Sequence, residues 1–113
     1  MNSGLGTDTI TVIRAALVVA DRYGNKTRDW AGAARTTVTG VSVQPVGSDE
    51  AVVDREWAAA HLRLFAPPGT DLTSTDRVAW RGDTYEVDGT PRRWFDDEGV
   101  EDHTEADLKR MTG

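Results

Sequence analysis

The fold is decided by residues 77–87, which run Arg77-Val78-Ala79-Trp80-Arg81-Gly82-Asp83-Thr84-Tyr85-Glu86-Val87. Apolar and polar side chains alternate on both sides of Gly82-Asp83, a pair that suits a two-residue hairpin turn with glycine first. This register pairs Trp80 with Tyr85 and Val78 with Val87, and it places all four side chains on one face. We therefore predict a β-hairpin at residues 77–87, and its core anchors are Val78, Trp80, Tyr85 and Val87.

Three further strands are predicted before this hairpin, at Thr9–Arg14, Thr36–Val46 and Ala60–Ala66. Each alternates apolar and polar residues or is bounded by Gly and Pro, as strands are. In the last of them, Leu62 and Leu64 are expected to point inward.

The strand at residues 36–46 carries two local signals. Gly40 predicts a bulge, and Pro45 marks an edge or a strand end. One face of this strand is expected to carry Thr37, Thr39, Val41 and Val43.

Five other segments carry weaker signals. Residues 15–20 suit a strand or a short helix. Residues 26–34 suit a loop in which Trp30 packs on the core. Residues 51–59 suit a helix capped by Ser48 or Asp49, or else a loop. Asp88-Gly89 predicts a turn. Residues 103–111 favour a helix by propensity and a strand by alternation.

Composition supports an all-β protein. The chain has 12 Val, 14 Thr and 2 Ile, and branched side chains favour strands. Frequent turns, with 11 Gly and 4 Pro, indicate a sandwich or a small barrel. The 113 residues suit a single domain, with residues 1–8 as a flexible N-terminus.

The expected core is small. Leu, Ile, Val and Phe make up only 22 of the 113 residues, although four Trp and two Tyr add apolar area. We therefore expect that a partner or further copies of the chain complete its burial.

Other protein classes fit poorly. The chain has no cysteine, so it holds no disulfide and no thiolate metal site. Its longest apolar run, Ala15–Ala20, is too short to cross a membrane, and residues 1–9 do not resemble a signal peptide. We therefore expect assembly in a cytoplasm-like compartment. The net charge of −6 argues against a protein that binds phosphate backbones.

No motif predicts catalysis. His61 and His103, the only histidines, lack a third metal ligand at a defined spacing. Residues 71–76 begin like a calcium loop, but no glycine stands at the sixth position and no Glu at the twelfth. The acidic residues between Asp96 and Asp102 suit a solvated loop. We predict no enzyme, no catalytic residue, no cofactor and no metal.

The tryptophans allow two interpretations. Arg92-Arg93-Trp94 and Trp80-Arg81 could stack on single-stranded bases. Alternatively, the four Trp fill or cover a small β core, which the negative net charge favours.

A set of turn and strand residues resembles one known family. The set includes Asp21–Asn25 with Asp29-Trp30, Arg35–Gly40 with Val43–Pro45, Arg63–Gly69, and Thr75–Val78 with Tyr85–Gly89. In this order and spacing, the chain resembles the head-to-tail stopper (head-closure or head-completion) proteins of bacteriophages with long non-contractile tails. The resemblance is to such proteins from phages of actinobacteria in particular, and the Arg to Lys ratio of 11 to 2 suits a GC-rich genome.

The resemblance implies a structural virion protein with a β-barrel-like fold. Such a subunit forms a ring of about 6 or 12 copies beneath the portal and adaptor, closes the DNA exit channel after packaging and docks the tail terminator or tail tube. DNA passes without specific binding, and a strand is implied at residues 103–111.

The resemblance also implies that the long connection between the second and third strands, Gly47–Ala59, faces the channel. The alternative is a surface loop in which Trp57 folds back onto its own subunit. The channel-loop candidates are Ser48, Asp49, Glu50, Val52, Val53 and Asp54.

Two other functions stay open at this point. One is a single-stranded nucleic-acid-binding barrel, and the other is a neighbouring tail terminator or adaptor. An adaptor is expected to be mainly helical, and a nucleic-acid binder should show strong salt dependence.

Far-ultraviolet circular dichroism checks the predicted class. The turn-bounded strands lead us to expect a sheet-dominated spectrum with less than about 15% helix. A spectrum dominated by helix would contradict the barrel.

Overall fold

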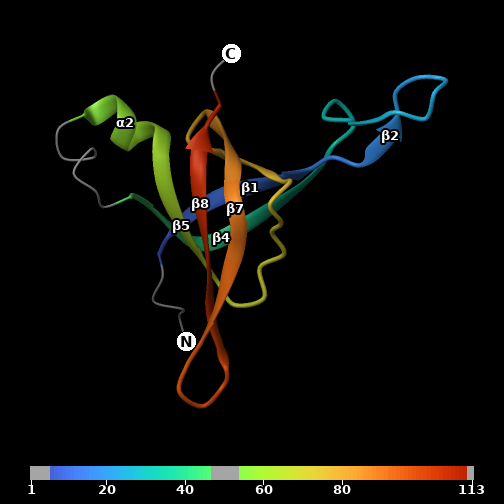
Figure 1. Cartoon of the computed structure of the whole chain (residues 1–113). Coiled ribbons are helices and arrows are strands. Elements are labelled where there is room, and N and C mark those ends of the chain that lie inside the picture. The colour runs from blue at the N-terminus through green and yellow to red at the C-terminus, as the bar shows by residue number, and fades with distance from the viewer. Residues whose placement is uncertain (1–5, 47–53, 112–113) are drawn as a thin grey trace.

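A computed structural model describes residues 6–46 and 54–111. Its elements are β1 (Asp8–Arg14), β2 (Leu17–Val19), β3 (Lys26–Arg28), β4 (Ala34–Pro45), α2 (Arg55–Ala60), β5 (His61–Ala66), β6 (Arg77–Trp80), β7 (Asp83–Phe95) and β8 (Glu101–Arg110). Six antiparallel strands close into a barrel in the order β1-β4-β5-β8-β7-β6, whereas β2 and β3 form a separate two-stranded sheet (Figure 1). The predicted all-β barrel is confirmed.

The core fills the inside of this barrel. In β5 and β8, alternate residues point inward: Leu62 and Leu64 of β5 lie opposite Leu108 and Ala106 of β8, and Ala66 is buried beside them. Val41, Leu64 and Val78 have no exposed area at all. The remaining core residues are Ile10, Val12, Leu72, Tyr85 and Val87.

The hairpin of β6 and β7 forms, but its predicted register is wrong by two residues. Val78 lies opposite Tyr85, and Trp80 lies opposite Asp83. The turn is therefore Arg81-Gly82, and both residues have positive φ, of 49° and 87°. Two positive φ angles are typical of a type I′ turn, whose twist matches that of the flanking strands. Because a shift of two residues preserves the pleat, the predicted face survives.

The four predicted anchors do lie together on that face. Val78, Tyr85 and Val87 are buried, and Trp80 is partly buried against the same core. The rings of Trp80 and Tyr85 lie 6.3 Å apart at their centroids. The sequence thus identified this part of the core correctly.

Gly40 forms the predicted bulge in β4. Asp8 pairs with Val41 and Thr9 with Thr39, so Gly40 is skipped, and its φ of 72° suits glycine. The bulge exchanges the two faces of the strand, because one extra residue reverses the alternation. The single face predicted for residues 37–43 is therefore wrong: Val38 and Val41 face the core, whereas Thr37 and Thr39 are exposed.

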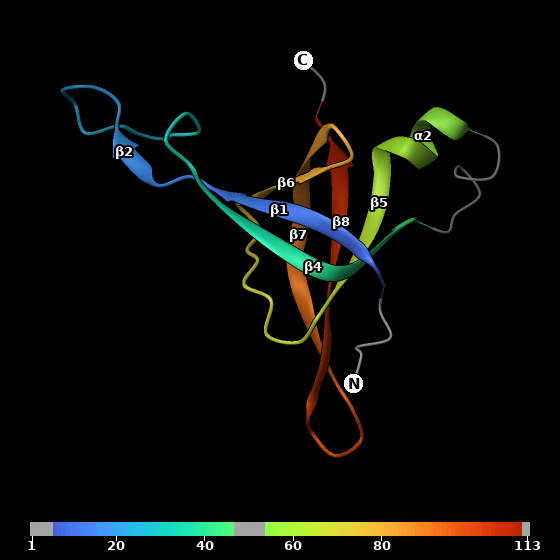
Figure 2. The ribbon, with the colours of Figure 1, turned by 180° about the vertical axis from the view of Figure 1, so that it is seen from behind.

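The chain does not turn at Asp88-Gly89, contrary to prediction. β7 continues to Phe95, and an irregularity between Asp88 and Arg92 bends it. Its partner β8 begins at Glu101, so the two strands extend past the barrel as a long hairpin (Figure 2). The strand predicted for the tail is confirmed, since Thr104, Ala106 and Leu108 are buried in alternation.

Residues 26–34 are not simply a loop. Lys26–Arg28 forms β3 and pairs with β2, and this two-stranded sheet projects from the barrel. Trp30 is not a core residue: it is only partly buried, and the guanidinium of Arg77 lies 3.7 Å from its ring centroid.

Helix α2 begins at Arg55, and its cap is Asp54. The Asp54 carboxylate accepts hydrogen bonds from the backbone N–H groups of Glu56 and Trp57. The predicted caps, Ser48 and Asp49, lie outside the described residues. Trp57 stacks on His61 of its own chain with ring centroids 4.1 Å apart, as in the alternative where it folds back.

Leu64 offers a test of the core. We expect Leu64→Ala to lower the free energy of unfolding by about 2–5 kcal/mol, because its side chain is fully buried. Chemical denaturation measures this loss. The control is Val19→Ala on β2, where the residue is 65% exposed and the change should stay within about 0.5 kcal/mol. Equal effects would contradict the assigned core.

Candidate assembly surfaces

Two projecting hairpins carry the exposed apolar surface of the described chain. We name Leu17–Arg28, which comprises β2, its turn and β3, the arm. We name Trp94–Asp102, which joins β7 to β8, the tip. Within residues 6–46 and 54–111, all the exposed large hydrophobic residues lie on these two segments: Leu17, Val18, Val19 and Tyr23 on the arm, and Trp94, Phe95 and Val100 on the tip.

Hydrogen bonds hold the arm at its base, and its outer end is exposed to solvent. Arg28 Nη1 donates to the Ala15 carbonyl oxygen at 3.0 Å, and the Asp29 N–H donates to the Ala16 carbonyl oxygen at 3.0 Å. The stacking of Arg77 on Trp30 adds a contact to the barrel. These contacts hold the direction in which the arm projects.

The outer turn of the arm is ordered by Asp21. Its carboxylate accepts hydrogen bonds from the Tyr23 N–H at 2.8 Å and from Asn25 Nδ2 at 2.8 Å. Hydrogen bonds from Asn25 and from the Tyr23 backbone hold the pKa of Asp21 below its ordinary value. The turn presents Tyr23, which is 75% exposed, at the end of the arm.

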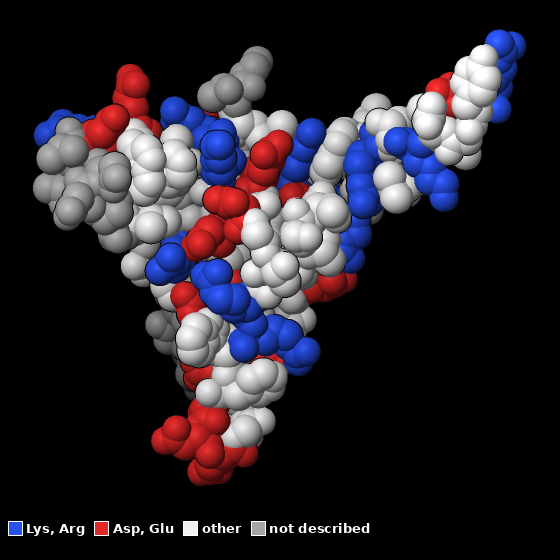
Figure 3. Space-filling view, in the orientation of Figure 1, with Lys and Arg blue, Asp and Glu red and all other residues white. Residues whose placement is uncertain are grey.

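The tip is ordered in a similar way by Asp96. Its carboxylate accepts from the Glu98 N–H at 2.8 Å and from the Val100 N–H at 3.0 Å. Figure 3 shows acidic side chains gathered at this end of the molecule and basic ones at the end of the arm. The tip carries five acidic residues, Asp96, Asp97, Glu98, Glu101 and Asp102, and no basic residue.

The base of the tip is tied to the barrel through Glu101. Its carboxylate binds Arg93 and accepts a hydrogen bond from the Gly69 N–H at 2.6 Å. Hydrogen bonds from Arg93 and Gly69 hold the pKa of Glu101 below its ordinary value. The predicted solvated acidic loop is therefore partly a structured turn.

Residues 71–76, which begin like a calcium loop in sequence, take part in an ion-pair network instead. Arg14 donates to Asp76 from Nε at 3.0 Å and from Nη2 at 2.8 Å, and it also binds Asp71 at 2.9 and 3.0 Å. The Asp76 side chain is fully buried, whereas that of Asp71 is 79% exposed. Burial by itself raises the pKa of Asp76, but hydrogen bonds from Arg14 and Thr73 outweigh it and the pKa is lowered.

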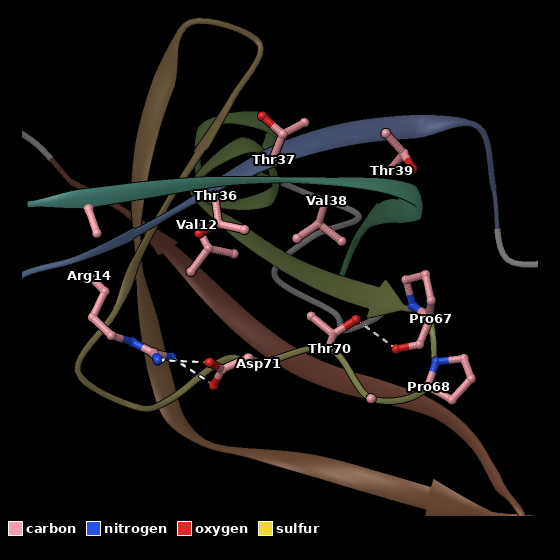
Figure 4. A pocket seen from close by; sticks show the side chains of 12 residues that line it. Val12, Arg14, Thr36, Thr37, Val38, Thr39, Pro67, Pro68, Thr70 and Asp71 are labelled. Atoms are coloured by element: carbon pink, nitrogen blue, oxygen red, sulfur yellow. Dashed lines mark hydrogen bonds and ion pairs between the residues drawn. The ribbon is translucent and has the colours of Figure 1, made fainter.

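The cavity shown in Figure 4 lies beside this network. It has a volume of about 430 Å³ and lies between β4 and residues 67–71. Its polar groups are threonine hydroxyls and the ion pair of Arg14 with Asp71. Because this arginine and this aspartate already bind each other, the cavity offers no free acid–base pair.

The histidines make local contacts. His61 Nδ1 lies 2.9 Å from the Trp57 carbonyl oxygen, and His103 lies between Asp102 and Glu105 at 2.7 and 3.1 Å. Burial lowers the pKa of His103, but the two carboxylates outweigh it and the pKa is raised. Within the described residues, no group of three His, Asp or Glu side chains is arranged to hold a metal.

The predicted channel loop is only partly described. Ser48, Asp49, Glu50, Val52 and Val53 lie outside the described residues, and Asp54 is exposed and caps α2. The prediction for this loop therefore stays a prediction. No helix in the described part of the chain is long and apolar enough to cross a membrane.

Sequence reasoning missed the arm and the tip as surfaces. A signal for the arm was present, because Leu17-Val18-Val19 is apolar on both faces of a strand and leads into a charged turn. For the tip, the pair Trp94-Phe95 stands directly before the acidic run at 96–98. What the sequence did not reveal is that β7 continues past Gly89 and carries this pair away from the core.

Comparisons with known proteins bear on the fold. No protein-family model matches the chain, and no curated protein does. Among solved structures, the chain is similar to protein SF1141 from Shigella flexneri 2a, known from a solution structure, with a TM-score of 0.60 and 23% sequence identity. The similarity covers 97% of this chain and 96% of that one. At this identity the likeness concerns the fold alone.

The two carboxylates around Arg14 provide a matched test. We expect Asp76→Asn to lower the free energy of unfolding by about 2 kcal/mol, because a buried carboxylate loses its charge-assisted hydrogen bonds to Arg14. Asp71→Asn, at an exposed position, should cost no more than about 1 kcal/mol. Chemical denaturation distinguishes the two, and an equal cost would contradict the dominant role of Asp76.

The ion pair of Arg14 with Asp76 makes the folding stability depend on pH. The pKa of Asp76 is lower in the folded than in the unfolded chain, so its contribution is complete above the ordinary aspartate pKa of about 4. That contribution is lost as the pH falls from there through the folded pKa. Asp76→Asn should therefore flatten the acid limb of the stability profile relative to Asp71→Asn.

Proposed function

We propose that this protein is a structural subunit of the head–tail connector of a long-tailed, non-contractile bacteriophage. In this role it closes the DNA exit channel after packaging and docks the tail. The observation that carries the proposal is the placement of all exposed large hydrophobic residues of the described chain on the arm and the tip. Such segments are costly in water and suit a subunit whose neighbours cover them.

The dimensions of the molecule support an assembly role. Its radius of gyration is 15.7 Å, against about 13 Å for a compact domain of this length. The excess comes from hairpins that project from a closed barrel (Figure 1). A two-stranded sheet such as β2–β3 is marginally stable alone, so a neighbouring surface would stabilise it.

The charge of the chain suits a passage for DNA. A net charge of −6 disfavours lasting contact with phosphates, so DNA can pass without specific binding.

The residues that carry the resemblance to stopper proteins lie in both exposed and buried parts of the structure. Asp21–Asn25 forms the turn of the arm, and Arg63–Gly69 includes the inner end of β5 and the turn that follows.

The proposed partners follow from this role. Copies of the chain form a ring, the portal and adaptor lie on one side, and the tail terminator or tail tube lies on the other. The protein would be found in the virion, at the head–tail interface, after assembly in the bacterial cytoplasm. No catalytic step is required of it.

The experiment combines the purified chain with the portal–adaptor complex encoded beside it. We expect sedimentation and electron microscopy to show an added ring at the DNA exit of the connector. Val19→Asp on the arm should weaken this attachment, because it places a charge in an apolar contact. Thr37→Asp, which adds the same charge to the exposed face of β4, is the matched control.

Two results would contradict the proposal. One is a chain that never joins the connector at any concentration at which it stays soluble. The other is tight, salt-dependent binding of single-stranded DNA in an anisotropy titration, which would favour the nucleic-acid-binding alternative.

A further inference from the structure

We propose that the arm of one copy docks on the tip of the next copy, head to tail. The inference rests on the proposed function because it names the contact between neighbouring copies in the proposed ring. It concerns the chain alone, however, and needs no portal, adaptor or tail protein.

Charge distinguishes the two surfaces. The arm carries Arg22, Lys26 and Arg28 against one acidic residue, Asp21, which gives a net charge of +2. The tip carries five acidic residues and no basic one, a net charge of −5. Opposite potentials of this kind steer two surfaces together and fix their relative orientation.

Apolar side chains accompany these charges on both sides. On the arm, Leu17 and Val19 are 52% and 65% exposed and stand on the same face of β2, since they are two residues apart. On the tip, Phe95 and Val100 are 52% and 60% exposed. Contact would remove these side chains from water, while the charges set the register.

Like-with-like contacts are disfavoured. Two tips bring together two sets of five acidic residues, and two arms bring together two basic ends. Because like charges repel across an interface, the pairing of arm with tip is the one that charge selects.

The arm and the tip of one chain project from different ends of the barrel in both views (Figures 1 and 2). They therefore meet between chains and not within one chain. A contact between two different surfaces of identical copies is heterologous, and it closes into a ring when the rotation per subunit allows.

Charge reversal tests the contact on the purified chain. One variant combines Arg22→Glu with Lys26→Glu on the arm, and the other combines Asp97→Lys, Glu98→Lys and Asp102→Lys on the tip. These changes take the net charge of the arm from +2 to −2 and that of the tip from −5 to +1. All five side chains are exposed, so folding should be preserved, which denaturation verifies. In sedimentation velocity at low salt, the self-association affinity of each variant alone should be lower than that of the natural chain by a factor of about ten or more.

Mixing the two variants is the decisive measurement. A negative arm then meets a positive tip, and the unchanged arm and tip meet as before, so the copies can alternate. We expect the equimolar mixture to recover the association of the natural chain, and added salt to weaken both. Variants that associate as the natural chain does, or a mixture that recovers nothing, would overturn the inference.

Cysteine trapping gives a second measurement, because the natural chain has no cysteine. Val19→Cys on the arm and Val100→Cys on the tip should form a mixed disulfide when the two variants are combined and oxidised. Val19→Cys with Thr37→Cys, where Thr37 lies on the barrel, is the control pair. Mixed disulfides at equal yield in both pairs would overturn the contact.

The outcomes separate this inference from the proposed function. A natural chain that stays monomeric and forms no mixed disulfide overturns the arm-to-tip contact, while attachment to the connector can still be observed. A chain that assembles through arm and tip but never joins the connector supports the contact and contradicts the virion role.

Discussion

The closure of six antiparallel strands around twelve buried residues is the constraint on which the rest of the structure depends. A chain with so few large apolar residues cannot support two packed layers, but a barrel encloses a small core with one sheet. Leu64, Val41 and Val78 come from different strands and are fully buried at the centre. In the described part of the chain, the large apolar residues that stay exposed lie where the chain extends beyond this interior.

That division of apolar residues connects the fold to its proposed role. β7 and β8 continue past the barrel and carry Trp94 and Phe95 outward, while the chain between β1 and β4 forms the arm. The base of each extension is tied by specific contacts, Trp30 with Arg77 for the arm and Glu101 with Gly69 for the tip. A fixed base and an exposed apolar end are what a subunit needs to present a surface to a neighbour at a defined angle.

Charged residues serve two separate purposes in this molecule. Arg14, which is partly exposed, pairs with the buried Asp76, so that the buried charge is compensated and the loop after β5 is held against β1. The charges of the arm and the tip are mostly exposed, and most of their contacts are with residues close by in the sequence. Charges of the second kind add little to folding stability, but they influence which surfaces meet and how quickly.

The sequence by itself determined the all-β class, the inward residues of β5, the bulge at Gly40 and the face shared by Val78, Trp80, Tyr85 and Val87, because period-two alternation and glycine conformation are local properties. It left a sandwich and a small barrel both open. It could not determine the register of the β6–β7 hairpin, since a shift of two residues leaves the alternation unchanged.

Tertiary structure alone decided that β7 continues through Gly89, because the strand pairs with β8 again from Arg92 onward, beyond the irregularity. It also decided that Asp76 is buried against Arg14, 62 residues away, since an ion pair between distant segments leaves no trace in local spacing. The positions of the arm and the tip as exposed surfaces are likewise decided only by the tertiary structure. An exposed apolar side chain looks like a core residue in sequence, and only closure of the barrel shows which of them are left outside.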